Sequence, residues 1–277
     1  MRSVLRAGTV LPLFFLMSFI LLASALAESD PRQELVLMTW NVRGYPENTA
    51  SKRDFFNEAL LSIEADILCV QEIKDSEVVS DFVNDTDYAR YAFTDIEEDG
   101  QDNAVFVMSD VYMNDYRAVD PIGFQHHPKA VYVAYEGFDA VLINVHLAYT
   151  DTAKRRQEWG LLADFANRAM EIDPDVIIAG DVNTEENESW DTVENLASTL
   201  GFHVLSPMGP NATPTNYGQT PHWFDHILVS PDLFTEEAIA AWTVLFADRE
   251  IANGVSDHKP VVGLFRTSPG YRDRKTE

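Results

Sequence analysis

Short apolar runs that interleave with helix-like segments constrain the fold of this 277-residue chain more than any other feature. Runs rich in Val and Ile, with the length of buried strands, occur at residues 35–40, 67–70, 104–108, 130–134, 140–145, 176–179, 224–229 and 261–265. Apolar residues with helical spacing occur at residues 51–65, 76–83, 152–170 and 189–200. The two kinds of segment do not alternate strictly, and residues 135–138 join two neighbouring strands as a predicted hairpin. We therefore expect one α/β domain with more than one sheet, at least one of them mixed.

The first 27 residues have the pattern of a removable export signal. Two arginines precede an apolar run at residues 10–22, and a small-residue A-x-A site follows, so that cleavage is expected before Glu28. A membrane anchor is the alternative, but the run is shorter than the roughly 20 apolar residues that span a bilayer, and no later stretch approaches that length. The sequence predicts a signal peptide at 1–27, a single domain at 28–277 and no stable membrane anchor in the mature chain.

Cys69 is the only cysteine, and it lies inside an apolar run where a buried core residue is expected. A single cysteine forms no disulfide within the chain. Export without disulfides fits a bacterial periplasm or the extracellular medium better than an animal secretory pathway. We therefore expect an exported protein of the bacterial periplasm or medium, and a monomer.

The chain is strongly acidic, with a formal charge of −25 at pH 7. Such a protein has no general electrostatic attraction for nucleic acid or for anionic membranes. A polyanionic substrate would have to be held by a few basic side chains or by a bound cation. Arg43, Lys74 and Lys259 lie close to the polar strand ends described next, which predicts a locally positive cleft on an acidic body.

Polar side chains gather at the ends of the predicted strands. In chain order they are Asn41, Glu72, His146, Asp181, Asn183, Asp225, Asp257 and His258. Taken singly, each is an ordinary strand terminus or turn residue. Strand ends at one edge of a sheet converge in space, however, and such edges are where sites form. The set therefore predicts one site with two histidines, several carboxylates and two amides.

Six short motifs carry these residues. They are Thr39-Trp40-Asn41-Val42-Arg43-Gly44, Gln71-Glu72, Asn144-Val145-His146-Leu147, Gly180-Asp181-Val182-Asn183, Trp223-Phe224-Asp225-His226-Ile227-Leu228 and Ser256-Asp257-His258-Lys259-Pro260. In this order they resemble the endonuclease/exonuclease/phosphatase superfamily, which contains deoxyribonuclease I, the abasic-site endonucleases, inositol polyphosphate 5-phosphatases and neutral sphingomyelinases. The resemblance spans residues 35–266. It implies a deoxyribonuclease I-like α+β or α/β fold, a four-layered sandwich of two packed, mostly antiparallel or mixed β-sheets flanked by helices.

The resemblance also implies a divalent-metal-dependent hydrolase of phosphoric esters. Glu72 is the expected ligand of Mg²⁺ or Mn²⁺, with Asn41 beside it through its amide oxygen, because hard cations prefer oxygen ligands. Asp257 would bind the metal or support the site. Ca²⁺ is considered only as a structural ion, and the choice between one and two metals stays open.

Five residues receive catalytic roles from the resemblance. Asp181 would orient or deprotonate the attacking water, and Asn183 would donate to the phosphate. His258 would stabilise the phosphoryl charge, with Asp225 holding its ring in one tautomer through a direct hydrogen bond. His146 is the candidate general acid toward the leaving group.

The remaining histidines have a structural interpretation. His226 follows Asp225 in a strand and therefore points to the opposite face. Three others have no motif context and are expected at the surface or in the core: His126, His127 and His203. His222 lies in the loop before the Asp225 strand, where a substrate contact is a second interpretation.

Asn144 and one basic run are interpreted as lying outside the reacting centre. Asn144 shares the face of His146 by the period of two, which favours a role behind the site. The basic run Lys154-Arg155-Arg156 opens a predicted helix and is interpreted as a solvated face rather than a phosphate clamp.

The resemblance implies a phosphate-ester substrate, either nucleic acid or a small phosphodiester or phosphomonoester. Abasic-site endonucleases carry a tyrosine motif where this chain has Asn144-Val145-His146-Leu147. The 5-phosphatases carry a Trp-Cys-Asp-Arg element and an arginine soon after Gly-Asp-x-Asn, where this chain has Trp223-Phe224-Asp225-His226 and Thr184-Glu185-Glu186. A nuclease or general phosphodiesterase is therefore favoured over a phosphomonoesterase of the inositol-phosphate or lipid-phosphate type. A non-catalytic binding module is the third hypothesis, and it would require the loss of site residues that are all present.

Overall fold

A computed structural model gives the structure of the protein. It describes residues 34–45, 50–74, 79–80, 83, 86–94, 101–116, 122–184, 192–206, 208, 212–218, 220, 222–245 and 256–267. The chain divides into two units, Met1–Gln33 and Glu34–Glu277. The predicted signal peptide and its cleavage site belong to the first unit and lie outside the described residues. All that follows concerns the second unit.

Two six-stranded sheets form the centre of this unit. The first has the order β11-β12-β1-β2-β4-β3. Its strands are β1 (Glu34–Tyr45), β2 (Ile67–Ile73), β3 (Tyr88–Phe93), β4 (Asp102–Met108), β11 (Ala238–Thr243) and β12 (Val261–Arg266). Only β1 and β2 run parallel, and the other described pairs are antiparallel.

The second sheet repeats this plan, with the order β5-β6-β7-β8-β10-β9. Its strands are β5 (Tyr112–Asp115), β6 (Lys129–Tyr135), β7 (Phe138–His146), β8 (Val176–Asp181), β9 (His203–Val204) and β10 (Asp225–Val229). Here β7 and β8 are the one parallel pair among the described pairings. Each sheet is therefore mixed, with a parallel pair near its middle.

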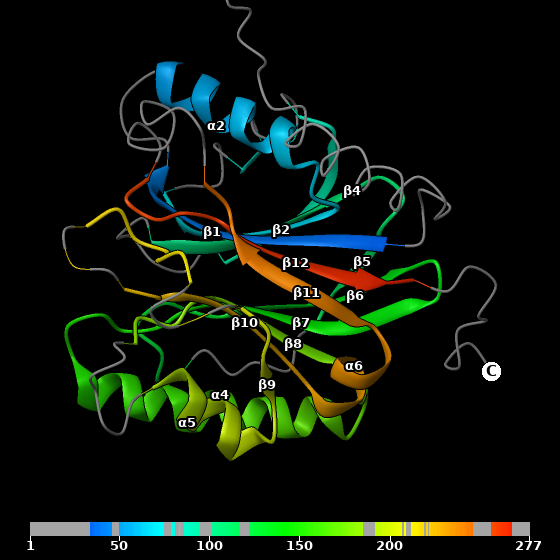
Figure 1. The fold of residues 1–277 in the computed structure, drawn as a ribbon, viewed down its shortest axis with the longest axis vertical. Coiled ribbons are helices and arrows are strands. Elements are labelled where there is room, and N and C mark those ends of the chain that lie inside the picture. The colour runs from blue at the N-terminus through cyan, green and yellow to red at the C-terminus, as the bar shows by residue number, and fades with distance from the viewer. Residues whose placement is uncertain are drawn as a thin grey trace, which may run out of the picture. The chain divides into compact units, whose positions relative to one another are not determined.

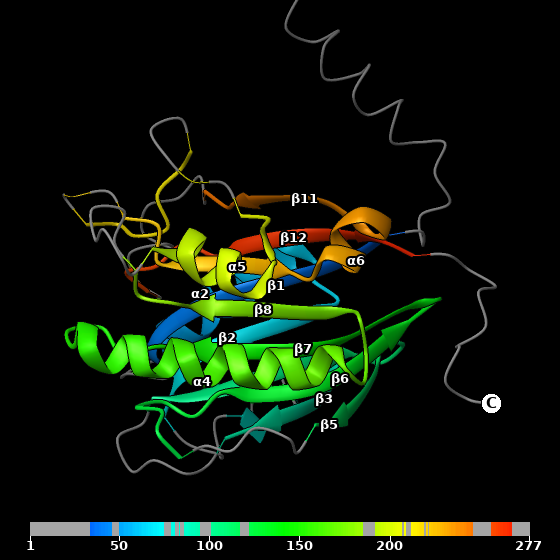
Figure 2. The ribbon, with the colours of Figure 1, turned by 90° about the horizontal axis from the view of Figure 1, so that it is seen from below.

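Helices cover the outer faces of the two sheets (Figure 1). The helix α2 (Ala50–Ile63) lies over the first sheet, and α4 (Thr152–Met170) and α5 (Val193–Leu200) lie over the second. In Figure 2, α4 and α5 are seen in front of the strands that they cover, and the short α6 (Pro231–Glu236) lies beside β11 and β12. The predicted four-layered sandwich of two packed, mixed sheets with flanking helices is confirmed.

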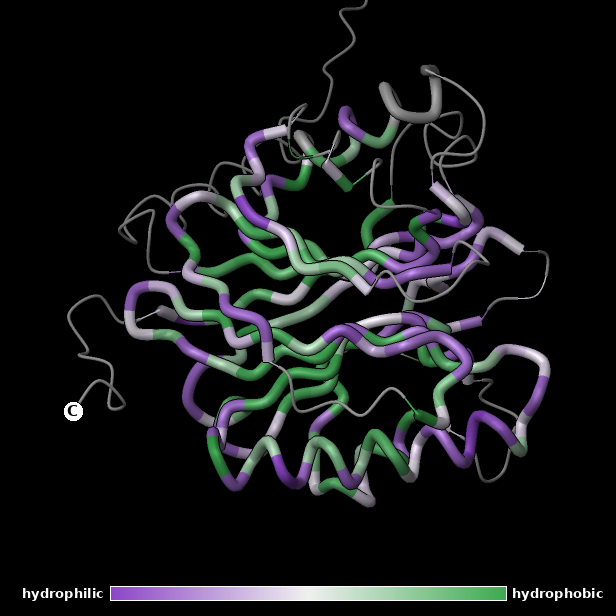
Figure 3. Tube along the Cα trace, turned by 180° about the vertical axis from the view of Figure 1, so that it is seen from behind, coloured by the Kyte–Doolittle hydropathy of each residue, from purple (hydrophilic) through white to green (hydrophobic). Residues whose placement is uncertain are grey.

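Three apolar clusters join the four layers. One lies between the sheets, with Leu142 and Ile227 facing Leu37. The second packs α4 and α5 on the second sheet, and the third packs α2 on the first, where the Phe56 ring lies 5.2 Å from that of Trp40. Figure 3 shows the matching pattern, with hydrophobic residues along the inner strands and hydrophilic ones on the outward side of α4. Burial of this apolar area is the main force that holds the layers together.

The predicted hairpin between residues 130 and 146 is confirmed. Strands β6 and β7 pair in antiparallel fashion up to Tyr135 and Phe138. The two turn residues have positive φ, 44° at Glu136 and 85° at Gly137. Two positive φ values are typical of the tight turn whose twist matches paired strands.

All eight predicted strands are present, but four strands were missed. These are β3, β5, β9 and β11, and they form the four sheet edges. Strands β5 and β9 have only four and two residues, and Arg90 interrupts β3. Strand β11 was missed although residues 238–242 are all apolar. Three predicted helices are confirmed, with α5 beginning at Val193 behind a Thr192 cap, while most of residues 76–83 lies outside the described residues. Among the described segments, no helix is both long and apolar enough to cross a membrane.

Candidate active site

The two parallel strand pairs bring the predicted residues together. Asn41 and Glu72 lie at the carboxyl ends of β1 and β2, and His146 and Asp181 are register partners at the ends of β7 and β8. The amide Nδ2 of Asn41 donates to Glu72 Oε1 and to Asp181 Oδ2, each at 2.9 Å. One side chain thus connects the two sheets at the edge where all four strands end.

A buried polar bridge fixes the spacing of the sheets beneath these residues. Asn144 of β7 donates from Nδ2 to the backbone oxygens of Val70 and Ala104, both at 2.9 Å. Its Oδ1 accepts from Gln71 Nε2 at 2.6 Å, and the same nitrogen donates to Thr39 Oγ1 at 3.0 Å. Because buried polar groups are costly unless paired, this bridge ties the Glu72 strand to the His146 strand in one register. The supporting position predicted for Asn144 is confirmed.

Backbone strain is concentrated at the strand ends. Arg43, Glu72 and Asn183 have φ values of 48°, 60° and 52°. The pairing of β1 with β2 and of β2 with β4 shifts register beside Arg43 and Glu72, as at a β-bulge. Positive φ at a residue other than glycine costs of order 1 kcal/mol and is typical of functional sites. At the second of these irregularities the Glu72 carboxylate lies 4.0 Å from His146 of the second sheet.

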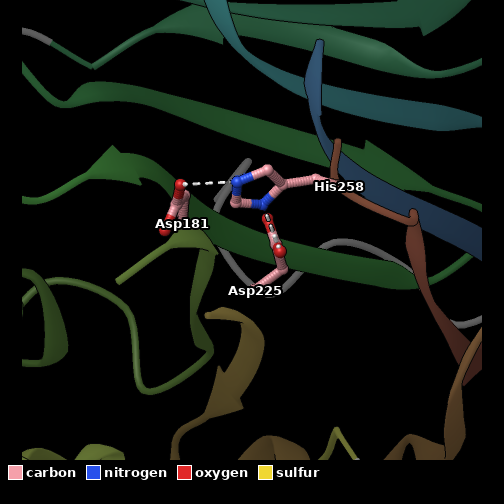
Figure 4. Close-up of side chains that lie close together, drawn as sticks. All are labelled: Asp181, Asp225 and His258. Carbon is pink, nitrogen blue, oxygen red and sulfur yellow. Dashed lines mark hydrogen bonds and ion pairs between the residues drawn. The ribbon is translucent and has the colours of Figure 1, made fainter. Parts of the chain in front are cut away.

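Asp225 and His258 form the predicted pair. His258 Nδ1 lies 2.7 Å from Asp225 Oδ2, although the residues are 33 positions apart. His258 Nε2 faces Asp181 Oδ2 at 3.8 Å, so the ring lies between two carboxylates (Figure 4). The predicted contact is confirmed, and the catalytic roles of the three residues remain predictions.

The closing motif is fixed against β1 by backbone contacts. Trp40 Nε1 donates to the backbone oxygen of His258 at 2.9 Å. Ser256 Oγ donates to the backbone oxygen of Asn41 at 2.5 Å and accepts from the backbone N–H of His258 at 3.0 Å. The motif of the first strand therefore positions the motif before the last strand, which explains why both occur together.

Asp181 is the centre of the site. Its Oδ1 accepts from the backbone N–H of Asn183 at 3.0 Å, and its Oδ2 faces His146 Nε2 at 3.7 Å. Asn183 Nδ2 donates to the backbone oxygen of Leu147 at 2.8 Å, which leaves its second amide hydrogen for a ligand. His146 Nε2 also lies 4.0 Å from Glu72 Oε1. The structure thus brings together seven of the eight predicted residues, all but Asp257, around Asp181 and the His258 ring.

The electrostatics give the two histidines different charges. Burial lowers the pKa of His258, but the carboxylates of Asp225 and Asp181 outweigh it and raise that pKa to about 10. Burial, with the nearby His126 and His258, holds the pKa of His146 well below its ordinary value. Burial raises the pKa of Asp181 to about 7 against the opposing effect of His258. These shifts favour an imidazolium at His258 and a neutral ring at His146 near neutral pH. The role of His146 as general acid stays a prediction.

The donor set fits a divalent cation. Asp181, Asp225 and His258 place one ligand atom each within 4.8 Å of one another. His258 is charged and bonded to Asp225, and an imidazolium has no lone pair for a metal. Glu72 is the better ligand, because its side chain is 23% exposed and leaves room for the waters that Mg²⁺ retains.

The other two predicted metal residues are engaged otherwise. The Oδ1 of Asn41 accepts from the backbone N–H of Arg43 at 2.9 Å, and its NH₂ faces the carboxylates. Metal binding through this oxygen would require the amide to turn over. Asp257 lies at the rim, with Oδ2 3.6 Å from Arg43 Nη1, which favours a supporting role.

A pocket of about 550 Å³ opens over these residues. Sequence reasoning missed part of its wall. His126 was expected at the surface or in the core, yet it is buried and lines this pocket beside His146. Tyr149 and Asn216 also line it, as does His222, for which a substrate contact was the second interpretation. These residues lie in loops with no motif spacing, so the sequence carried no signal for His126, Tyr149 and Asn216, and His222 was indicated only by its place before the Asp225 strand.

The basic residues differ from expectation. Lys259 is buried and its Nζ donates to the backbone oxygens of Pro214 and Asn216, away from the pocket. Arg155 was interpreted as part of a solvated face, but it is buried and donates to the backbone oxygens of Ala148 and Tyr149. Both side chains bind loops instead of substrate. Among the described residues that line the pocket, Arg43 supplies one guanidinium and there is no lysine, so the cleft has fewer basic side chains there than predicted.

His226 has the structural role that its strand position predicted. Its Nε2 donates to the backbone oxygen of Trp223 at 2.5 Å, and its Nδ1 accepts from Ser206 Oγ at 2.9 Å. The ring is fully buried, and burial lowers its pKa to about 4. It is therefore a neutral core residue on the face opposite to Asp225.

This burial predicts an acid-sensitive fold. Between pH 6.5 and 4 the unfolded chain protonates His226 and the folded chain does not, so the free energy of unfolding falls as the pH falls. We expect His226→Gln to reduce the loss of stability between pH 7 and pH 4.5 by about 2 kcal/mol. Urea unfolding at the two pH values measures this. His203→Gln, which removes an exposed histidine and keeps His226, should retain the wild-type pH dependence. An equal loss of stability in wild type and in His226→Gln would contradict the assignment.

The comparisons with known proteins agree with this geometry. The family model described as the Endonuclease/Exonuclease/phosphatase family matches residues 38–258. Truncated TDP2 from Caenorhabditis elegans has a similar structure, with a TM-score of 0.65, 17% identity and coverage of 84% of this chain and 98% of that chain. AP endonuclease LMAP from Leishmania major gives a TM-score of 0.64 at 14% identity, with coverage of 87% of this chain and 90% of that chain. TDP2 from D. rerio, complexed with single-strand DNA product, gives a TM-score of 0.64 at 16% identity, with coverage of 84% of this chain and 99% of that chain.

A search of curated proteins found no match. At these identities the solved structures show the fold alone. The family match is stronger evidence, since it covers most of the described unit and contains every predicted site residue from Asn41 to His258. The chain belongs to the endonuclease/exonuclease/phosphatase family.

Proposed function

We propose that this protein is a divalent-metal-dependent hydrolase of phosphodiesters, with nucleic acid or a small diester as substrate. Family membership supports phosphoester hydrolysis. The observation that carries the finer proposal is the arrangement around Asp181. A buried carboxylate faces an imidazolium at 3.8 Å and a second histidine at 3.7 Å, at the floor of an open pocket.

Each residue has one task in this proposal. Asp181, whose pKa is raised toward neutrality, accepts a proton from the attacking water or orients it. His258, charged and held by Asp225, donates to a non-bridging phosphoryl oxygen as negative charge develops there. Asn183 offers its remaining amide hydrogen to the same phosphate, and the neutral His146 donates toward the departing oxygen. A cation held by Glu72 would supply Lewis-acid stabilisation and Mn²⁺ or Mg²⁺ would suit its oxygen.

The charge of the site favours a diester over a monoester. Glu72, Asp181, Asp225 and Asp257 contribute four carboxylates, while Arg43 and His258 are the cations named at the described part of the site. A diester carries one negative charge, whereas a monoester carries nearly two at neutral pH. With Lys259 bonded to Pro214 and Asn216, the described side chains offer little positive charge of their own, so a dianion or a multiply phosphorylated inositol would depend more on the bound cation than a diester would. Phosphomonoester hydrolysis is therefore the second candidate.

A substrate panel tests the proposal. With purified mature protein and Mg²⁺ or Mn²⁺, we expect bis(p-nitrophenyl) phosphate to be hydrolysed with a kcat/KM at least about tenfold above that of p-nitrophenyl phosphate. Plasmid, single-stranded DNA, RNA, inositol phosphates and sphingomyelin identify the natural class. The DNA product bound by D. rerio TDP2 makes single-stranded DNA the first polymer to test. A preference for monoesters would favour the second candidate, and binding without turnover would favour a non-catalytic module.

We also propose that the protein is exported and that the mature chain begins at Glu28. The basic, apolar and A-x-A regions of residues 1–27 support this. Expression of the full chain in a bacterial host should place a product of the corresponding mass in the periplasm or medium. Intact-mass measurement decides it, since a chain that retains Met1 in the membrane fraction would contradict the proposal.

A further inference from the structure

The His146 ring lacks the support that holds His258. Asp225 fixes His258 through Nδ1. In contrast, Nδ1 of His146 is buried and has no hydrogen-bond partner among the described residues. Its Nε2 has only carboxylates at 3.7 and 4.0 Å, beyond hydrogen-bond distance. Something other than a hydrogen bond must set the orientation of this imidazole.

A second imidazole lies flat against it. The rings of His126 and His146 have centroids 4.3 Å apart and an interplanar angle of 14°. Both side chains are buried, with 3% and 4% exposure. A stacked ring restricts rotation about χ2, because turning His146 out of this plane would drive it into its neighbour.

His126 is itself held from helix α4. Its Nε2 lies 3.0 Å from Gln125 Nε2. The buried carboxylate of Glu158 accepts from the backbone N–H of Gln125 at 2.6 Å and, through its other oxygen, from that of Ala148 at 2.8 Å. Ala148 follows His146 by two positions, so one carboxylate anchors the segments that carry both rings. Charge-assisted hydrogen bonds of this kind are among the stronger ones in proteins.

We propose that His126 is a positioning residue that orients His146 by ring stacking, with Glu158 fixing the two segments that carry the stacked rings. The kinetic consequence rests on the proposed hydrolase function, in which His146 donates toward the leaving group. The stack requires a flat ring at position 126 and does not require its nitrogens. Loss of the ring should lower kcat with little change in KM, because ground-state binding of the phosphate uses other residues.

Paired substitutions test this. His126→Leu removes the flat ring, and we expect kcat on an unactivated dinucleotide to fall about 10- to 100-fold, the range typical of residues that orient a reacting group. His126→Phe keeps a ring that stacks and should lose less than about fivefold. The matched control is His203→Leu, since His203 also stacks, on Phe234 at 3.9 Å and 12°, and is not a pocket residue. It should retain wild-type kcat.

Comparing substrates with different leaving groups gives a second test. p-Nitrophenolate needs little help to depart, so the loss in His126→Leu should be smaller on bis(p-nitrophenyl) phosphate than on the dinucleotide. Equal losses in His126→Phe and His126→Leu would assign the role to a ring nitrogen and overturn the proposal. Unchanged kcat in folded His126→Leu would overturn it as well. If His126→Leu does not fold, Glu158→Gln replaces one acceptor oxygen by a donor and should show the same kcat-specific loss.

An NMR measurement separates this inference from the proposed function. With ¹³C-labelled histidine, the ring protons of His146 should be shielded by the stacked neighbour in wild type and in His126→Phe, and should move downfield in His126→Leu. Shifts that do not respond show that the rings are not stacked in solution. If the His146 shift changes in His126→Leu but the wild-type protein hydrolyses no diester, the stack is established and the proposed hydrolase function is refuted.

Discussion

Replacing Glu72 with glutamine is expected to lower kcat on a phosphodiester about a thousandfold in the presence of Mg²⁺. The change removes one charge at the carboxylate that fits a divalent cation best, and such a cation contributes several kcal/mol to transition-state stabilisation. Glu72 Oε1 accepts from Asn41 and lies within 4.0 Å of His146, while the side chain stays partly open to solvent. The loss should therefore come from missing metal rather than from a collapsed pocket, and circular dichroism should be unchanged.

Glu64→Gln provides the matched control. Glu64 is an exposed glutamate that also has a positive φ, 53° against 60° at Glu72, and it is not a pocket residue of the site. The same substitution there should leave kcat near wild type. Titration of Mn²⁺ should show a weaker apparent affinity in Glu72→Gln and not in Glu64→Gln. Full turnover of wild type in excess EDTA would refute the metal requirement.

His258→Ala is expected to lower kcat about 100- to 1000-fold, the range found when a charge-stabilising donor is removed. Asp225→Asn should cost about 10- to 100-fold, because it leaves the ring in place but removes the charged acceptor at 2.7 Å. The double variant should be little worse than His258→Ala alone, since the two side chains act as one unit. Losses that add strictly on a logarithmic scale would show that Asp225 and His258 act separately.

The pH dependence gives an independent check on the same pair. In the proposed mechanism His258 acts in its protonated form, so we expect the rate to fall as the pH rises through its pKa, which the two carboxylates raise to about 10 against the effect of burial. Asp225→Asn removes one of these carboxylates and lowers that pKa. The alkaline limb of the kcat profile should therefore move to lower pH in the variant. If the alkaline limb stays at its wild-type pH, a group other than His258 produces it.

The polar ends of the strands could be predicted from the sequence because strand geometry leaves few choices. An apolar run that pairs in the middle of a sheet must place its last residues at the sheet edge. Asn41, Glu72, His146 and Asp181 follow four such runs, and the register of the parallel pairs brings them together. The opposite orientation of His226 follows from the same period of two.

The tertiary structure alone decided which side chains surround those ends. Edge strands such as β3 and β9 have no continuous apolar run, because Arg90 interrupts β3 and β9 has only two residues. Strand β11 was missed although residues 238–242 are all apolar. Loop residues are placed by distant partners, as His126 is by the carboxylate of Glu158 on α4. The sequence shows that residues 155 and 259 are basic, but only the packed structure shows that Arg155 and Lys259 donate to backbone carbonyls. The sequence by itself determined the strands of the core and the chemistry at their ends, because both depend on local periodicity. The pocket wall and the charge state of each histidine depend on burial and on contacts between segments far apart in the chain, which local periodicity does not encode.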